Sequence, residues 1–181
     1  MVMVEPIRKR EDIRKIEKIL KRQSLRNLVL FKMGINCGLR ISDILALNVS
    51  DVRDKDILTL VEQKTSKQRK IPINNILKWI LKNYIEGKSD SAPLFASLKT
   101  SQRLDRFTAY KIIVKACRKA KINENIGTHT LRKTFGYHYY KKYKDVAMLQ
   151  KIFNHSSPNI TLRYIGITED EIYDSYSNFS L

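Results

Sequence analysis

Apolar and polar residues alternate with a helical period along most of the chain. Between residues 6 and 36 the isoleucines and leucines return every three or four positions, with a break at Ser24 and a glycine at Gly38. That period puts the apolar side chains on one helical face, serine is a favourable N-terminal cap, and glycine commonly ends a helix. We therefore predict two helices in this region. The same pattern predicts further helices over about 41–47, 74–84, 105–121 and 145–153, and another that starts near residue 129.

The stretch that follows the third predicted helix has a different pattern. Residues 57–62 and 69–73 are rich in branched side chains, and the basic segment 63–68 separates them. Two such runs around a polar turn predict a β-hairpin with a basic tip, and we expect a short additional strand before it near residues 47–49. The predicted fold class is therefore α+β, mainly α-helical, with a small antiparallel sheet over about 47–73.

The composition indicates one folded domain, residues 1–181, with a polyanionic partner. Hydrophobic residues make up 43% of the chain, and 35 Lys and Arg against 18 Asp and Glu leave a net charge of +17. This excess favours nucleic acid as the partner, and no amphipathic anchor favours a membrane surface. Because we find neither a signal peptide nor an apolar run that could span a bilayer, we expect a cytoplasmic protein. The two cysteines lie in apolar runs without the spacing of a zinc site.

Side chains suited to phosphate chemistry gather between residues 129 and 164. His129 and Arg132 are three residues apart at the head of a predicted helix, His155 lies in a polar break, and Tyr164 follows nine residues later. A guanidinium matches the geometry of a phosphate, an imidazole transfers protons near neutral pH, and a tyrosine is a covalent nucleophile once a base takes its proton. Each signal is weak alone, since a tyrosine near a helix end is more often a half-buried anchor.

Two further cations extend this set. Arg40 lies at or near the start of a helix, where free backbone N–H groups and the helix dipole already favour an anion, and Asp43 could support its guanidinium. An ordinary surface arginine paired with Asp43 explains Arg40 equally well. Lys64 lies in the basic tip of the hairpin, which could enter a DNA groove, and the alternative is a solvated loop, since lysines are common at turns. We also expect DNA contacts from five other cations: Lys67, Arg69, Lys133, Arg106 and Lys111. The last two lie on the polar face of a predicted helix, which is more commonly just solvated.

Taken in order, these motifs resemble the catalytic domain of the tyrosine recombinases, the phage integrase family. The matching pieces are Gly-Leu-Arg-Ile-Ser-Asp at 38–43, Lys-Thr-Ser-Lys-Gln-Arg-Lys-Ile-Pro-Ile at 64–73, His-Thr-Leu-Arg-Lys-Thr-Phe at 129–135, and Asn154-His155 with Tyr164. The resemblance covers about residues 6–178. It implies the fold of that catalytic domain and the activity of a site-specific DNA recombinase of integrase, excisionase or invertase type.

The resemblance also implies a role for each candidate. Tyr164 is the nucleophile that forms a 3′-phosphotyrosine, Arg40 and Arg132 hold the non-bridging oxygens, Lys64 protonates the leaving 5′-oxygen, His129 is a base or phosphate donor, and His155 is a phosphate donor. No metal or other cofactor is expected. Two other classes remain open: a type IB topoisomerase-like nicking-closing enzyme and a non-catalytic DNA-binding regulator.

The family resemblance finally implies an assembly. We expect double-stranded DNA as the partner, a homotetramer on two DNA sites, and a monomer or dimer without DNA. The acid-led start of a last helix at 168–171 suggests that residues 168–181 form a C-terminal docking tail. We expect neither a core-binding nor an arm-binding domain within these 181 residues, as in a fragment of a longer integrase or in a naturally short member.

Overall fold

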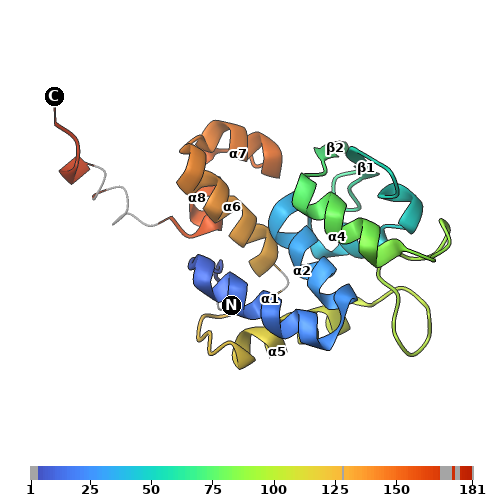
Figure 1. Ribbon diagram of the computed structural model, residues 1–181. Coiled ribbons are helices and arrows are strands. Elements are labelled where there is room, and N and C mark those ends of the chain that lie inside the picture. The colour runs from blue at the N-terminus through green and yellow to red at the C-terminus, as the bar shows by residue number, and fades with distance from the viewer. Residues whose placement is uncertain (1–3, 128, 168–172, 174–175, 181) are drawn as a thin grey trace.

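The computed structural model describes residues 4–127, 129–167, 173 and 176–180. Its helices are α1 (Arg10–Gln23), α2 (Leu25–Cys37), α3 (Ile41–Ala46), α4 (Asn75–Ile85), α5 (Arg106–Lys119), α6 (Thr130–Tyr143), α7 (Val146–Phe153) and α8 (Pro158–Ile165), with a short 3-10 helix, η1 (Val49–Asp51). Two strands, β1 (Ile57–Val61) and β2 (Gln68–Pro72), form an antiparallel hairpin. The α+β, mainly helical class predicted from the sequence is confirmed (Figure 1).

Helix α2 is the centre of the larger of two hydrophobic cores. Its side chains are apolar on nearly every side, and Val29, Leu30 and Phe31 are completely buried. A helix of this kind has to be covered all round, and α1, α3, α4 and α6 all pack against it. Ser24 caps its start as predicted, because the serine hydroxyl accepts a hydrogen bond from the Asn27 N–H. The helix therefore supports the elements that carry the candidate catalytic residues.

A smaller core joins α6, α7 and α8. Its buried members are Leu149, Phe153, Ile165 and Ile167. In Figure 1 these helices, drawn in orange, lie on one side of α2, while α4 and the hairpin lie on the other. The two cores therefore meet beside α2, and this is where the sequence motifs converge.

The predicted hairpin is present, and it pairs Ile57 with Pro72 and Val61 with Gln68. The additional strand expected near 47–49 is wrong, since within the described residues Asn48 makes only an isolated bridge, to Pro93. Proline has no N–H to extend a ladder. The backbone N–H of Asn48 also donates to the Asp51 carboxylate at 2.8 Å at the start of η1, which turns the chain away from an extended path.

The expected docking tail falls largely outside the described residues. Tyr173, Tyr176 and Phe179 are described there, and all three side chains are largely exposed. Among the helices that the structure describes, none is both long and apolar enough to cross a membrane.

Candidate active site

Five of the six candidate catalytic residues come together at the seam between the two cores. They arrive from the start of α3, the start of α6, the loop between α7 and α8, and α8 itself. The five are Arg40, His129, Arg132, His155 and Tyr164. The sixth, Lys64, lies exposed in the hairpin turn, and among the described residues it has no hydrogen bond or ion pair with the other five.

Arg132 connects the two cores directly. Its side chain is only 3% exposed, and its guanidinium donates to the backbone oxygen of Gly38 at 2.6 Å and to that of Phe153 at 3.1 Å. The guanidinium carbon also lies 4.5 Å from the centre of the Phe153 ring. A planar fork with two fixed acceptors has little rotational freedom. The arginine is therefore set in place before any phosphate binds.

Tyr164 lies on α8 and faces the start of α6. Its hydroxyl is 3.3 Å from Nδ1 of His129, and its ring packs edge-on against the rings of His155 and Phe153. Burial raises the pKa of the phenol above its usual range, while the charges of Arg132 and Arg40 act in the opposite direction. A neutral phenol of this kind needs a base before it can attack, and the nearest candidate is the imidazole beside it.

His129 has the protonation state that such a base requires. It is the N-cap residue of α6. Partial burial lowers the pKa of its imidazole below the ordinary value of 6.5, and the charges of Arg132 and Arg40 lower it further. The ring is therefore neutral near pH 7, so that Nδ1 can accept a hydrogen bond or a proton from Tyr164.

His155 is fixed by the break between α7 and α8. Helix α7 ends at Asn154 in the left-handed conformation, with φ of 53°, and Nδ1 of His155 then lies 3.1 Å from the Thr161 hydroxyl. Burial lowers the pKa of this imidazole too, and Arg132 and Arg40 add to the effect. His155 is thereby held beside the ring of Tyr164, with its Nδ1 engaged by Thr161.

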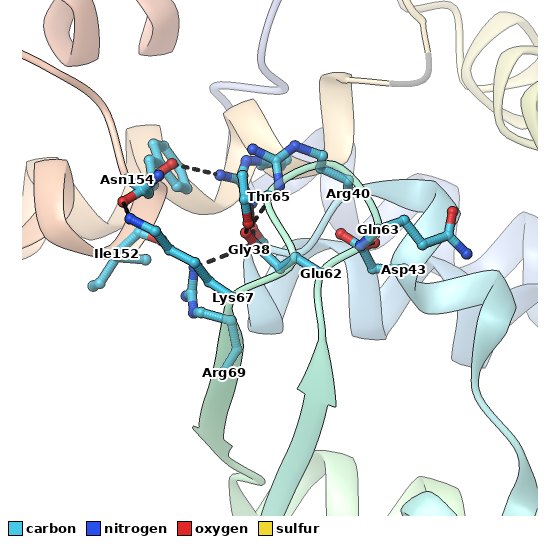
Figure 2. A network of polar contacts seen from close by, with 12 residues as sticks. Gly38, Arg40, Asp43, Glu62, Gln63, Thr65, Lys67, Arg69, Ile152 and Asn154 are labelled. Carbon is cyan, nitrogen blue, oxygen red and sulfur yellow. Dashed lines mark hydrogen bonds and ion pairs between the residues drawn. The ribbon is translucent and has the colours of Figure 1, made fainter.

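Arg40 is held by a carboxylate that the sequence analysis did not single out (Figure 2). Its Nη1 lies 3.1 Å from Oε2 of Glu62, so the predicted support from Asp43 is wrong. Asp43 instead accepts a hydrogen bond from the backbone N–H of Gln63 at 3.0 Å. The reason is local: Arg40 is the N-cap of α3 with extended dihedral angles, φ −71° and ψ 148°, so the helical spacing of three residues does not bring the two side chains together.

The structure divides the five predicted DNA-contacting cations into two groups. Lys67, Arg106 and Lys111 are exposed. Arg69, by contrast, pairs with Glu62 and donates to the Ile152 oxygen at 2.7 Å. Lys133 is 3% exposed and lies beneath the Tyr164 ring. Arg69 and Lys133 are therefore held by groups of the protein itself, as Arg40 and Arg132 also are, and DNA contact by all five cations stays a prediction.

Glu62 is the functional candidate that sequence reasoning missed. It directly follows β1, immediately before the basic turn, and it is 1% exposed. An acidic residue at the end of a branched run, next to a cluster of cations, is the signal that could have drawn attention to it.

The family-model comparison agrees with this geometry. A model described as the phage integrase family matches residues 8–171. The chain therefore belongs to the phage integrase family. It is 48% identical to the probable integrase/recombinase YoeC of Bacillus subtilis (strain 168) over 179 residues, which are 99% of this chain and 98% of that protein. It is also 27% identical to the tyrosine recombinase XerA of Pyrococcus furiosus, over 94% of this chain and 60% of XerA.

Solved structures show the same fold. The crystal structure of XerA recombinase superposes with a TM-score of 0.78 at 20% identity, over 97% of this chain and 63% of that one. The catalytic domain of bacteriophage HP1 integrase superposes with a TM-score of 0.68 at 21% identity, over 97% of this chain and 95% of that one. The tyrosine recombinase catalytic-domain fold predicted from the motifs is therefore confirmed.

Proposed function

We propose that this chain is a site-specific DNA recombinase that cuts and rejoins DNA through a tyrosine nucleophile. The observation that carries the proposal is the 3.3 Å contact between the Tyr164 hydroxyl and Nδ1 of His129, beside the guanidinium of Arg132. Membership of the phage integrase family supports it. A nucleophile, a base and fixed cations are the groups that phosphoryl transfer without a bound metal requires.

The cleavage step follows from these positions. His129 takes the phenolic proton, and the oxygen of Tyr164 forms a bond to the scissile phosphorus as the bond to the 5′-oxygen breaks. Arg40 and Arg132 hold the non-bridging oxygens, whose negative charge grows in the transition state. His155 donates a further hydrogen bond. The product is a 3′-phosphotyrosine, and the phosphodiester energy is kept for rejoining.

The leaving 5′-oxygen needs a proton, and we assign this donor role to Lys64. Its amino group is exposed in the hairpin turn, so it has to approach the scissile bond when DNA lies over the site. The reverse reaction uses the same groups: a 5′-hydroxyl from a second strand gives its proton to Lys64 and displaces Tyr164.

The proposed partner is double-stranded DNA, and the proposed assembly is a homotetramer on two sites. The net charge of +17 supports the first. A lambda integrase tetramer bound to a Holliday junction superposes on this chain with a TM-score of 0.73 at 18% identity, over 91% of this chain and 49% of that one. We further propose that residues 168–181 link neighbouring protomers, which is compatible with the exposed Tyr173, Tyr176 and Phe179.

Covalent trapping tests the proposal. Duplexes that the protein binds are first selected from a random library, and a nick is then placed beside each possible scissile phosphate so that the cut 5′ fragment diffuses away. We expect an SDS-resistant protein–DNA adduct that is lost in Tyr164→Phe. The matched control is Tyr143→Phe, the same change on an exposed tyrosine of α6, which should form the adduct normally. An adduct that survived Tyr164→Phe would reject the nucleophile, and binding without any adduct would favour the regulator class.

The topoisomerase class predicts a different product. A nicking-closing enzyme relaxes supercoiled plasmids of any sequence, whereas a recombinase joins strands from two copies of one selected site. Relaxation without site preference, and without recombinant product, would therefore contradict the recombinase proposal.

A further inference from the structure

Glu62 is a buried carboxylate in the middle of a cationic site. Its two oxygens contact cations from three separate segments: Oε2 lies 3.1 Å from Nη1 of Arg40, and Oε1 lies 3.3 Å from Nη1 of Arg69 and 4.0 Å from Nη1 of Arg132. Two of these three arginines are the proposed phosphate clamps. Charges this close repel one another strongly when water is excluded, and one shared carboxylate reduces that repulsion.

The contact with Arg40 leaves hydrogen-bonding capacity for a ligand. Nη1 of Arg40 is close enough to Glu62 for an ion pair, but its geometry does not meet the angle of a directed hydrogen bond. Glu62 therefore fixes the position of the guanidinium by charge. Nη1 itself is buried, and it is the Nε and Nη2 groups of Arg40, which have no hydrogen-bond partner among the described residues, that keep their capacity to donate to a phosphate.

The same carboxylate closes the turn that carries Lys64. Its Oε2 accepts a hydrogen bond from the Thr65 hydroxyl at 2.7 Å. The backbone of Glu62 bonds across the same turn, accepting from the Ser66 N–H at 2.8 Å and donating to the Lys67 oxygen at 3.0 Å. Figure 2 shows Glu62 and Thr65 at the hairpin tip, directed towards Arg40. One side chain thus joins the turn of the proposed proton donor to the proposed phosphate clamp.

Glu62 stays ionised in this position. Burial would raise the pKa of its carboxyl group, but the hydrogen bond from Thr65 and the charges of Arg40 and Arg69 outweigh it and lower the pKa overall. A buried carboxylate with this many partners is a fixed structural charge, and it has no proton to exchange with the reaction.

We propose that Glu62 is a positioning residue that holds the Lys64 turn against Arg40, so that the proton donor and the phosphate clamp act on the same phosphodiester. This inference rests on the proposed recombinase function. It predicts that loss of the carboxylate damages the chemical step and spares DNA binding, because removing a negative charge from a cationic surface does not weaken its attraction for phosphate.

The first test separates binding from chemistry. In Glu62→Gln, the dissociation constant for the selected duplex should be unchanged or lower. The single-turnover cleavage rate at saturating protein should fall about 10- to 100-fold, which is the range typical when a residue that orients the groups of a charged site is removed. The matched control is Glu17→Gln, which removes the same charge from the Glu17–Lys32 ion pair between α1 and α2 and should cleave at the wild-type rate. Equal cleavage by Glu62→Gln and the wild type would overturn the proposal.

The second test asks whether the defect acts through Lys64. A substrate with sulfur in place of the bridging 5′-oxygen has a leaving group that departs without protonation. If Glu62 positions the proton donor, the ratio of wild-type to Glu62→Gln rates should move toward one with this substrate. An unchanged ratio would overturn the link to Lys64, because a defect confined to the arginines affects both substrates equally.

A second variant keeps the proposal testable if Glu62→Gln does not fold. Thr65→Val is nearly isosteric and removes only the hydroxyl that binds Glu62, so it should show the same partial rescue by the sulfur substrate. If it cleaves the ordinary substrate as fast as the wild type, the proposed link through the turn is wrong. Absence of an adduct from the wild-type protein with both substrates is a different result, which rejects the recombinase function itself.

Discussion

Gly136 is the position where the packing of the smaller core can be tested most directly. It lies on α6 at the closest approach of α7 and α8, and a Cβ added there would lie 2.6 Å from Cγ2 of Ile165 and 2.7 Å from two ring carbons of Phe153. Ordinary contact begins at 3.4 Å, so Gly136→Ala needs a displacement of about 0.8 Å. Ile165 is the neighbour of Tyr164, and the displacement therefore reaches the nucleophile.

The expected thermodynamic effect is modest. Overpacking in a core costs about 1–3 kcal/mol, and replacing glycine by alanine inside a helix returns about 1 kcal/mol. The net loss in the free energy of unfolding is thus about 0–2 kcal/mol, or a fall in Tm of up to about 8 °C for a chain of this size. The kinetic effect should be larger, since a misplacement near 1 Å can reduce a rate about 100-fold.

Thermal unfolding and single-turnover cleavage should therefore respond to different extents. The control is Gly87→Ala: Gly87 has φ of 70° and no atom within 4 Å of an added Cβ. In Gly87→Ala the left-handed backbone conformation reduces the free energy of unfolding by about 1–2 kcal/mol, and the added methyl group does not contact α6, α7 or α8. We expect a similar loss of Tm but wild-type cleavage in Gly87→Ala. Wild-type cleavage in Gly136→Ala would refute the argument that this contact sets the position of Tyr164.

Three further predictions concern charge. Because His129 is useful as a base only when neutral and its pKa is lowered, cleavage should be independent of pH between 7 and about 9 and fall as the pH drops through a value below 6.5, as pH–rate profiles of the wild type and His129→Gln can show. Arg132→Lys should leave one buried carbonyl without a donor, which costs about 1–3 kcal/mol by denaturant unfolding, and should slow cleavage about 10²–10³-fold. If Arg106 and Lys111 each contact a phosphate, Arg106→Ala and Lys111→Ala should each reduce by about 1 the slope of the logarithm of DNA affinity against the logarithm of salt concentration. An unchanged slope would mean that the residue is only solvated.

Local sequence rules predicted most of the fold. Asp105 and Asp145 cap α5 and α7 by accepting from the N–H groups of Thr108 and Met148, and such caps are readable because donor and acceptor lie three residues apart. The hairpin was predictable for a similar reason, as its register follows from the turn. The short strand near 47–49 failed because its potential partner contains Pro93, more than 40 residues away.

The candidate site was predictable as a set of residues but not as a network. Motif spacing selects Arg40 and Arg132, yet the Glu62 carboxylate that links them reaches both only after β1, α3 and α6 have packed together. The burial of Lys133 has the same origin. The sequence analysis named Lys133 only as a DNA-contacting cation, and only the packing of α8 onto α6 shows that it lies beneath Tyr164.

The contacts between the hairpin and α7 indicate which cations remain available to DNA. Lys67 donates to the side chain of Asn154 at 2.9 Å in an exposed contact, and exposed contacts of this kind contribute little to stability. Arg69 instead donates to the backbone oxygen of Ile152 and pairs with the buried Glu62. A phosphate can therefore replace the partner of Lys67 at small cost, whereas the same exchange at Arg69 would leave a buried carboxylate with fewer partners. Since Lys67 lies on the same turn as Lys64, DNA that binds Lys67 would also bring the proposed proton donor to its substrate, while Arg69 holds the turn end of the hairpin against α7.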